Sequence, residues 1–148
     1  MKVCSSRFGE LEVGDDRVIT FPKGLLGFPK YQRYVLIEAG DDSYFWWLQS
    51  VDLPDLAFIV TDPSLFVPTY KVPIRPEQMG EIGIHSIDDA QVLVIVNKRG
   101  ETLTGNLQGP LVIHVTDRVG EQLVLSDRRF TTRVPLVELP SPLQAQSA

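Results

Sequence analysis

The sequence lacks most residue types that build covalent or metal-bound frameworks. Cys4 is its one cysteine, which excludes an internal disulfide and any zinc or iron–sulfur site that needs several cysteines. At 148 residues the chain is long enough to bury a core without such links. Because cytosolic proteins keep their thiols reduced, we expect a cytoplasmic protein.

Long apolar segments are also missing. No apolar run exceeds five residues, so we expect no membrane span, and residues 1–7 contain no apolar signal region. The net charge of −5 argues against direct nucleic-acid binding, which usually requires a basic surface.

Few residues are suited to catalysis. Histidine occurs only as His85 and His114, and the sequence contains no glycine-rich phosphate loop. We interpret both histidines as structural and expect no enzyme activity and no cofactor. One enzymatic hypothesis stays open: a small hydrolase that uses Cys4. Hydrolase activity that is lost on alkylation of the cysteine would support it.

Aspartates occur as three adjacent pairs, which raises the question of a metal site. Neighbouring side chains on a strand point to opposite faces, and aspartates in turns usually accept local backbone hydrogen bonds. We therefore expect no metal. The pairs are Asp15-Asp16, Asp41-Asp42 and Asp88-Asp89.

Charge is distributed unevenly along the chain. Residues 1–37 carry a net +2, residues 38–89 a net −8 and residues 90–148 a net +1. No Lys or Arg occurs from Tyr34 to Tyr70. Such a segment either attracts a cationic partner or simply keeps the loops soluble.

A period of two predicts a mainly β protein, a small and mostly antiparallel β-barrel-like domain with one or two short helical turns. The helical turns are expected to begin near Pro76 and Ser86. We expect one domain over residues 1–135 and a disordered tail over 136–148. The predicted strands are Gly9–Val13, Val18–Phe21, Tyr34–Ala39, Tyr44–Gln49, Leu56–Thr61, Val92–Asn97, Leu111–Thr116 and Gln122–Leu125.

The aromatic segment Tyr44–Leu48 has more side chains than one barrel interior can accept. In a strand, Phe45 and Trp47 face one way and the remaining three residues face the other. One set is therefore either a contact site or is covered by the proline-rich residues 62–76. A barrel with exposed aromatics also leaves open an OB-like fold that binds single-stranded nucleic acid.

Several segments, in this order and spacing, resemble the FliW family of flagellar assembly factors. The similarity covers about residues 7–136. The segments are Arg7–Val13, Ile19–Phe28, Phe45–Asp52, Pro54–Phe58, Thr61–Pro63, Thr104–Leu107, Gly109–Ile113 and Ser126–Arg133.

The resemblance implies a non-enzymatic β-barrel that binds two proteins in the cytoplasm. One is flagellin, near its C-terminal region, and the other is CsrA, a basic RNA-binding repressor of flagellin translation. Export of flagellin would free the factor to bind CsrA and relieve the repression. As partner contacts we expect a set of acidic and aromatic residues: Phe45, Trp47, Asp52, Asp55, Asp62 and Phe66.

Overall fold

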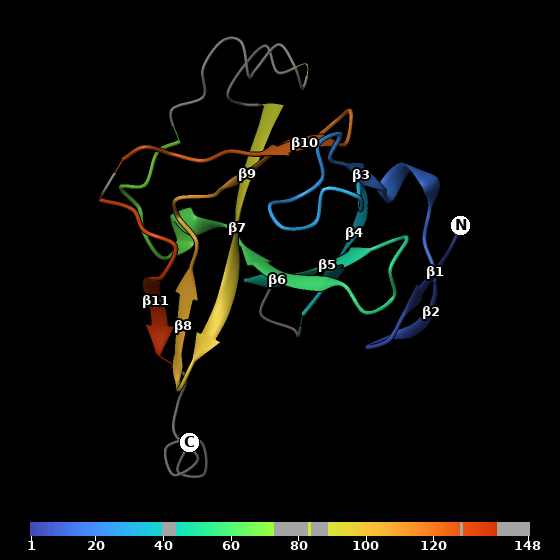
Figure 1. The fold of residues 1–148 in the computed structure, drawn as a ribbon, viewed down its shortest axis with the longest axis horizontal. Helices are drawn as coiled ribbons and strands as arrows, with labels where there is room; N and C mark the ends of the chain where they lie inside the picture. Colours follow the sequence, from blue (N-terminus) through green and yellow to red (C-terminus); the bar gives the residue numbers. More distant parts are fainter. Residues whose placement is uncertain (40–43, 73–82, 84–88, 128, 139–148) are drawn as a thin grey trace.

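The computed structural model describes residues 1–39, 44–72, 83, 89–127 and 129–138, and these residues form mainly β-strands (Figure 1). Two short 3-10 helices, η1 (Asp15–Arg17) and η2 (Pro63–Leu65), connect strands. The strands are β1 (Lys2–Ser5), β2 (Gly9–Glu12), β3 (Ile19–Thr20), β4 (Arg33–Glu38), β5 (Phe45–Ser50), β6 (Ala57–Thr61), β7 (Ala90–Arg99), β8 (Thr102–Gly105), β9 (Leu111–His114), β10 (Val119–Gln122) and β11 (Val134–Glu138).

Seven strands close into a barrel. Their order is β7-β6-β5-β4-β3-β10-β9, and β9 pairs again with β7. All of these pairings are antiparallel except β3–β10, where Val119 lies beside Thr20 in parallel. The predicted fold class, a mostly antiparallel β-barrel with short helical turns, is therefore confirmed.

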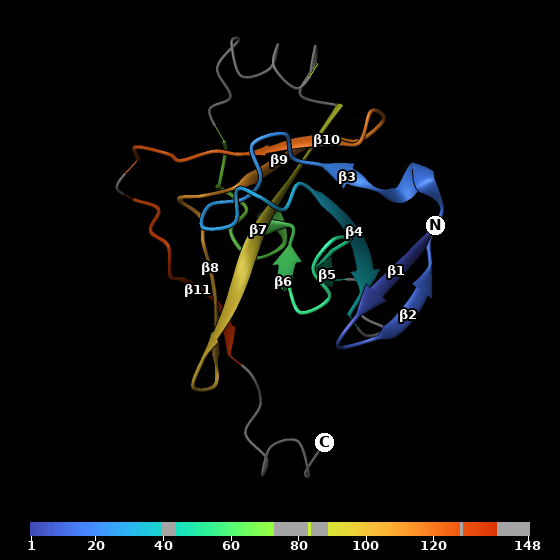
Figure 2. The same ribbon diagram turned by 45° about the vertical axis from the view of Figure 1, so that its right-hand side comes forward.

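Strand β7 is long enough to pair with strands of the barrel and with a strand outside it. Residues 90–93 pair with β9 and close the barrel, whereas residues 96–99 pair with β8. Strand β11 then adds to β8, so β7, β8 and β11 extend beyond the barrel (Figure 2). Because β11 includes residues 136–138, a strand crosses the boundary that the sequence placed after residue 135.

The barrel interior is filled by side chains that alternate along the paired strands. Aromatic pairs join them, with Phe21 and Tyr34 edge to face at 5.7 Å between ring centroids. Partly buried Trp46 packs against this interior cluster. The buried members are Ile19, Phe21, Leu25, Tyr34, Leu48, Leu56, Val60, Leu93, Leu111 and Ile113.

A second buried cluster, the outer cluster, lies on the other face of β7. It is covered by the loop that follows η2 and by the segment between β10 and β11. Here the Tyr70 ring meets the Phe130 ring edge to face at 4.8 Å. The buried members are Tyr70, Val94, Leu107, Val112, Leu123 and Leu125.

The hairpin β1–β2 forms a separate two-stranded sheet at one side of the barrel (Figure 2). Its turn is joined to the loop between β5 and β6, because the Ser6 N–H donates to the Pro54 carbonyl at 3.0 Å. Val3 is fully buried, so the hairpin packs against the rest of the molecule and is not an exposed appendage.

The prediction for residues 122–125 was wrong, since the strand is β10, three residues earlier. Gly120 looks like a turn residue in the sequence, but it lies within the strand, where an added Cβ would be 2.6 Å from the Phe21 ring. Close packing therefore requires glycine at this position. The helical turns predicted near Pro76 and Ser86, like His85 and residues 139–148, lie outside the described residues.

Candidate partner-binding site

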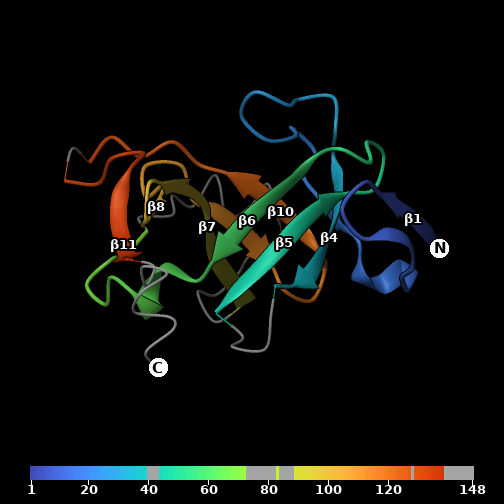
Figure 3. The same cartoon turned by 90° about the horizontal axis from the view of Figure 1, so that it is seen from below.

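The outer face of β4, β5 and β6 carries the aromatic residues that the interior does not accommodate. Strand alternation places Phe45 and Trp47 on this face, whereas Leu48 points into the barrel. Trp47 is directly opposite Ile37 on β4 and Ile59 on β6. Phe45, Trp47, Ile37 and Ile59 are each only partly buried, so the face is apolar and accessible. Figure 3 shows the three strands that carry these residues side by side.

Trp47 is held by the turn of the β1–β2 hairpin. The Arg7 guanidinium carbon lies 4.0 Å from the centroid of the Trp47 ring, and the Phe8 ring meets it edge to face at 6.0 Å. A guanidinium over an indole face is a favourable cation–π arrangement. Arg7 and Phe8 thus fix the orientation of Trp47 and leave its ring partly exposed.

Phe45 lies at the other end of β5 and stacks on Phe66, with 5.8 Å between ring centroids. Asp62 places Phe66 there by starting η2. Its Oδ1 accepts hydrogen bonds from the Ser64 N–H at 2.9 Å and the Ser64 hydroxyl at 2.7 Å, and Pro63 follows at the first helical position. One of the predicted acidic contacts therefore also has a structural role as a helix cap.

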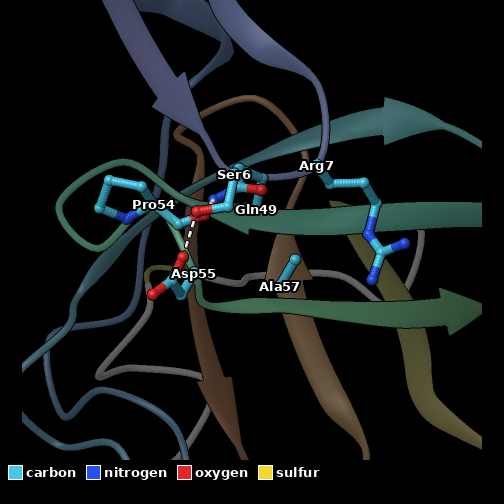
Figure 4. Close-up of a pocket in the computed structure, with 6 residues that line it drawn as sticks. All are labelled: Ser6, Arg7, Gln49, Pro54, Asp55 and Ala57. Carbon is cyan, nitrogen blue, oxygen red and sulfur yellow. Dashed lines mark hydrogen bonds between the residues drawn. The ribbon is translucent and has the colours of Figure 1, made fainter.

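Asp55 lies beside a polar notch of about 280 Å³ between the hairpin and the loop that joins β5 to β6 (Figure 4). The Ser6 hydroxyl donates to its Oδ1, and Arg7 points away from Asp55 along the wall of the notch. Gln49 forms the floor and is fully buried. Its Nε2 donates to the Pro54 and Leu56 carbonyls at 3.2 Å each, which holds the loop in place.

Asp52 differs from the other two acids because it has a cationic partner. Its Oδ1 lies 2.6 Å from Nη2 of Arg33, and this hydrogen bond, together with the negative charge, raises the pKa of Arg33. Although the segment from Tyr34 to Tyr70 contains no Lys or Arg, the fold therefore places a cation from outside that segment beside Asp52. Among the described residues, neither Asp55 nor Asp62 forms an ion pair.

Comparison with known proteins identifies the family. The model of the family described as FliW protein matches residues 2–136. The chain is 38% identical over 139 residues to the flagellar assembly factor FliW of Natranaerobius thermophilus, with 92% of each chain covered. The FliW of Leptospira interrogans is 37% identical over 141 residues, covering 93% of this chain and 94% of that protein.

The chain belongs to the FliW family of flagellar assembly factors. A crystal structure of the flagellar assembly factor FliW superposes with a TM-score of 0.84 at 29% identity, covering 93% of this chain and 97% of that one. The family match includes both the β1–β2 hairpin and the start of β11, so these additions to the barrel belong to the FliW fold.

In this FliW-family chain the predicted contacts form two groups along β5. Trp47, Asp52 and Asp55 lie toward the hairpin, and Phe45, Asp62 and Phe66 lie toward η2. The sequence did not indicate that Arg7 and Phe8 would contact Trp47, because a pairing across 40 residues leaves no local signal. The dipeptide Asp62-Pro63, a typical start of a helix, was a usable signal for the cap.

Two further side chains with reactive groups, Cys4 and His114, lie in the part of this FliW-family chain that the structure describes. Cys4 is an exposed free thiol. His114 is buried in β9, where its Nδ1 accepts a hydrogen bond from the Asp117 N–H at 2.8 Å and holds the following turn. Among the described residues, no three His, Cys, Asp or Glu side chains converge, and no helix has the length and apolar character to cross a membrane.

Proposed function

We propose that this protein acts in the cytoplasm as a non-enzymatic regulator that binds flagellin and, when flagellin has been exported, binds and antagonises the repressor CsrA. Flagellin translation would then follow flagellin secretion. The observation that carries this proposal is the outer face of β5, where half-buried Phe45 and Trp47 lie between Asp55 and Asp62.

The apolar part of this face suits flagellin. An amphipathic segment docks by placing its apolar side chains on a partly exposed apolar surface. Trp47 and the Phe45–Phe66 stack offer two aromatic anchors, the type of residue that most often dominates binding energy at interfaces. Truncating them should therefore weaken flagellin capture more than removing any nearby charge.

The acidic part suits CsrA, which the family resemblance describes as a basic RNA-binding protein. Asp55 and Asp62 are the predicted acids without an ion-pair partner among the described residues. Unpaired carboxylates attract a basic surface and repel the phosphates of its RNA. Asp52, already paired with Arg33, should contribute less.

The test uses isosteric variants, because reversing Asp62 would also remove the η2 cap. In the double variant Asp55→Asn/Asp62→Asn, the amide oxygens still accept from Ser6 and Ser64, so the fold is retained while two charges are lost. We expect CsrA affinity, measured by calorimetry at low salt, to fall roughly threefold to tenfold. The control Glu101→Gln/Glu138→Gln removes the same charge from two exposed residues, one in the β7–β8 turn and one in β11, and should bind normally.

A second arm tests the aromatic contacts. Trp47→Ala and Phe66→Ala should each weaken binding of the flagellin C-terminal region by about tenfold or more. Unchanged binding in both arms would reject the assignment of the site. Failure of the unmodified protein to bind either partner, together with a gel shift of single-stranded RNA, would reject the function and favour the nucleic-acid-binding alternative.

A further inference from the structure

Three cations line a second pocket that is built from different residues. This basic pocket has a volume of about 440 Å³ and lies where β7, the end of β8 and the start of β11 meet. Its cations are Lys98, Arg99 and Arg133, all exposed to solvent. The rest of its lining is formed by Ile95, Asn97, Asn106 and Thr132.

These cations differ from four others in the described part of the chain, each of which contacts a carboxylate. Arg33 and Arg129 each pair with a carboxylate at 2.7 Å or less, and Lys2 and Lys23 also contact carboxylates. Within the described parts of the chain, by contrast, none of the three pocket cations has an ion-pair partner. Although the net charge of the protein is −5, the described residues provide no counter-charge for the three cations around this cavity.

Strand pairing brings residues of β7 close to the segment that precedes β11. Asn97 and Arg99 alternate with Lys98 along β7, so they share one face. Asn97 is directly opposite Thr104 on β8, and Thr104 is opposite Pro135 on β11. Arg133 lies in the turn that leads into β11 and lines the same pocket.

We propose that the basic pocket binds a carboxylate presented by an acidic segment of a protein partner. A guanidinium offers two parallel N–H donors that match the two oxygens of a carboxylate, and two such groups line this pocket. The neutral side chains of Asn97 and Thr132 add hydrogen-bonding groups at the wall. The carboxylate comes either from acidic side chains or from the end of a chain.

A nucleic acid is a poorer fit to the same pocket. Proteins that bind nucleic acids usually carry a basic patch or stripe that contacts many phosphates, whereas this pocket supplies three cations on an acidic molecule. A short acidic peptide engages only local cations and experiences less repulsion from the rest of the surface. This inference concerns residues outside the acidic and aromatic face, and it does not depend on the proposed function.

The experiment titrates the full-length protein with three probes and follows the backbone amides by NMR. The probes are a blocked hexaglutamate peptide, a hexaglutamine peptide with a free C-terminal carboxylate, and a single-stranded U10 RNA. We expect one of the two peptides to shift the signals of Asn97, Arg99 and Arg133, and the shifts to diminish as salt increases. The hexaglutamate response identifies side-chain carboxylates, and the hexaglutamine response identifies a terminal one.

Substitutions test which groups make the contact. Arg99→Gln and Arg133→Gln should each weaken binding of the responding peptide roughly threefold to tenfold. The matched control Lys30→Gln removes one exposed charge elsewhere and should leave affinity unchanged. Arg133→Lys keeps the charge but loses the paired donors, so it should recover only part of the affinity.

Three results would overturn the inference. They are the absence of shifts at the pocket with either peptide, an equal loss of affinity in Lys30→Gln, and tighter binding of U10 than of both peptides. Circular dichroism checks separately that each of these variants is folded. A loss of peptide binding in a folded variant is then due to the loss of the contact that its side chain makes.

Discussion

The interior cluster and the outer cluster contain similar apolar side chains, but different structures enclose them. Paired strands surround the interior, whereas loops cover the outer cluster on β7. One buried tyrosine in each shows the consequence. The Tyr34 hydroxyl in the interior has no hydrogen-bond partner among the described residues, while the Tyr70 hydroxyl donates to the Leu107 carbonyl at 2.6 Å. The interior depends on packing, and the outer cluster adds a specific bond that holds a loop.

The largest expected effect comes from cavities in the two clusters. Leu48→Ala in the interior should lower the free energy of unfolding by about 3–5 kcal/mol, because paired strands cannot move into the space. Leu123→Ala in the outer cluster should cost about 2–3 kcal/mol, since a covering loop can settle partly into the cavity. Urea denaturation of both variants measures the difference. An equal or larger loss for Leu123→Ala would contradict the comparison.

Ionisation of Tyr34 gives the next largest effect. Burial, and to a smaller extent the charge of Asp52, raises the pKa of Tyr34 from 10.0 to about 12. In the unfolded chain the phenol ionises near pH 10 while the folded state still holds it neutral, so this stabilisation is complete below pH 10 and is lost between pH 10 and 12. The loss should approach roughly 1.4 kcal/mol per pH unit.

The matched variant Tyr34→Phe isolates this contribution. The difference in unfolding free energy between the unmodified protein and Tyr34→Phe should change steadily from pH 10 to pH 12 and stay constant below pH 9. A difference that is flat over the whole range would show that the Tyr34 hydroxyl is not held in an apolar environment.

Replacing a glycine by alanine should also distinguish the enclosed barrel interior from the strands β8 and β11, which extend beyond the barrel. Gly120→Ala places a Cβ 2.6 Å from the buried Phe21 ring and should cost about 1–3 kcal/mol. At Gly105 the nearest atom is the end of the Leu136 side chain, at 2.9 Å, which can rotate away. Gly105→Ala should therefore change stability by less than about 1 kcal/mol. Thermal denaturation of the two variants provides the measurement, and a greater loss at Gly105 would be inconsistent with a packed interior.

The smallest effect concerns the tyrosine hydroxyls at neutral pH. Tyr70→Phe should cost about 1–2 kcal/mol because the buried Leu107 carbonyl loses its donor. Tyr34→Phe removes a hydroxyl without a described partner and should be neutral or slightly stabilising. Denaturation at pH 7 compares the two, and a clear loss of stability in Tyr34→Phe would indicate a bonding partner for that hydroxyl.

Local patterns predicted the parts of the fold that depend on alternation. Strands β5 and β6 are found where the sequence placed them, and Phe45 and Trp47 occupy the face opposite to Leu48. The sequence also left open whether residues 62–76 cover the aromatics. Phe66 covers Phe45, so this alternative holds for one aromatic, whereas the hairpin covers Trp47.

Features that depend on distant contacts were not predictable in this way. Strand β11 pairs with β8 despite containing Pro135, which is tolerated because β11 is an edge strand. Strand β1 has only four residues, and its buried Val3 gives too short a pattern to detect. The ion pair of Arg33 with Asp52 joins the start of β4 to the loop after β5, and no local sequence pattern indicates it.

The adjacent tryptophans give the protein two optical reporters on opposite sides of one strand. Trp46 packs against the barrel interior, whereas Trp47 lies outside beneath the Arg7 guanidinium. The fluorescence spectrum is therefore the sum of two tryptophan emissions. Unfolding changes the emission of both tryptophans, whereas a protein that docks on the outer face changes only that of Trp47. In the variant Trp46→Phe, a change in tryptophan fluorescence on binding would therefore report on the outer face alone.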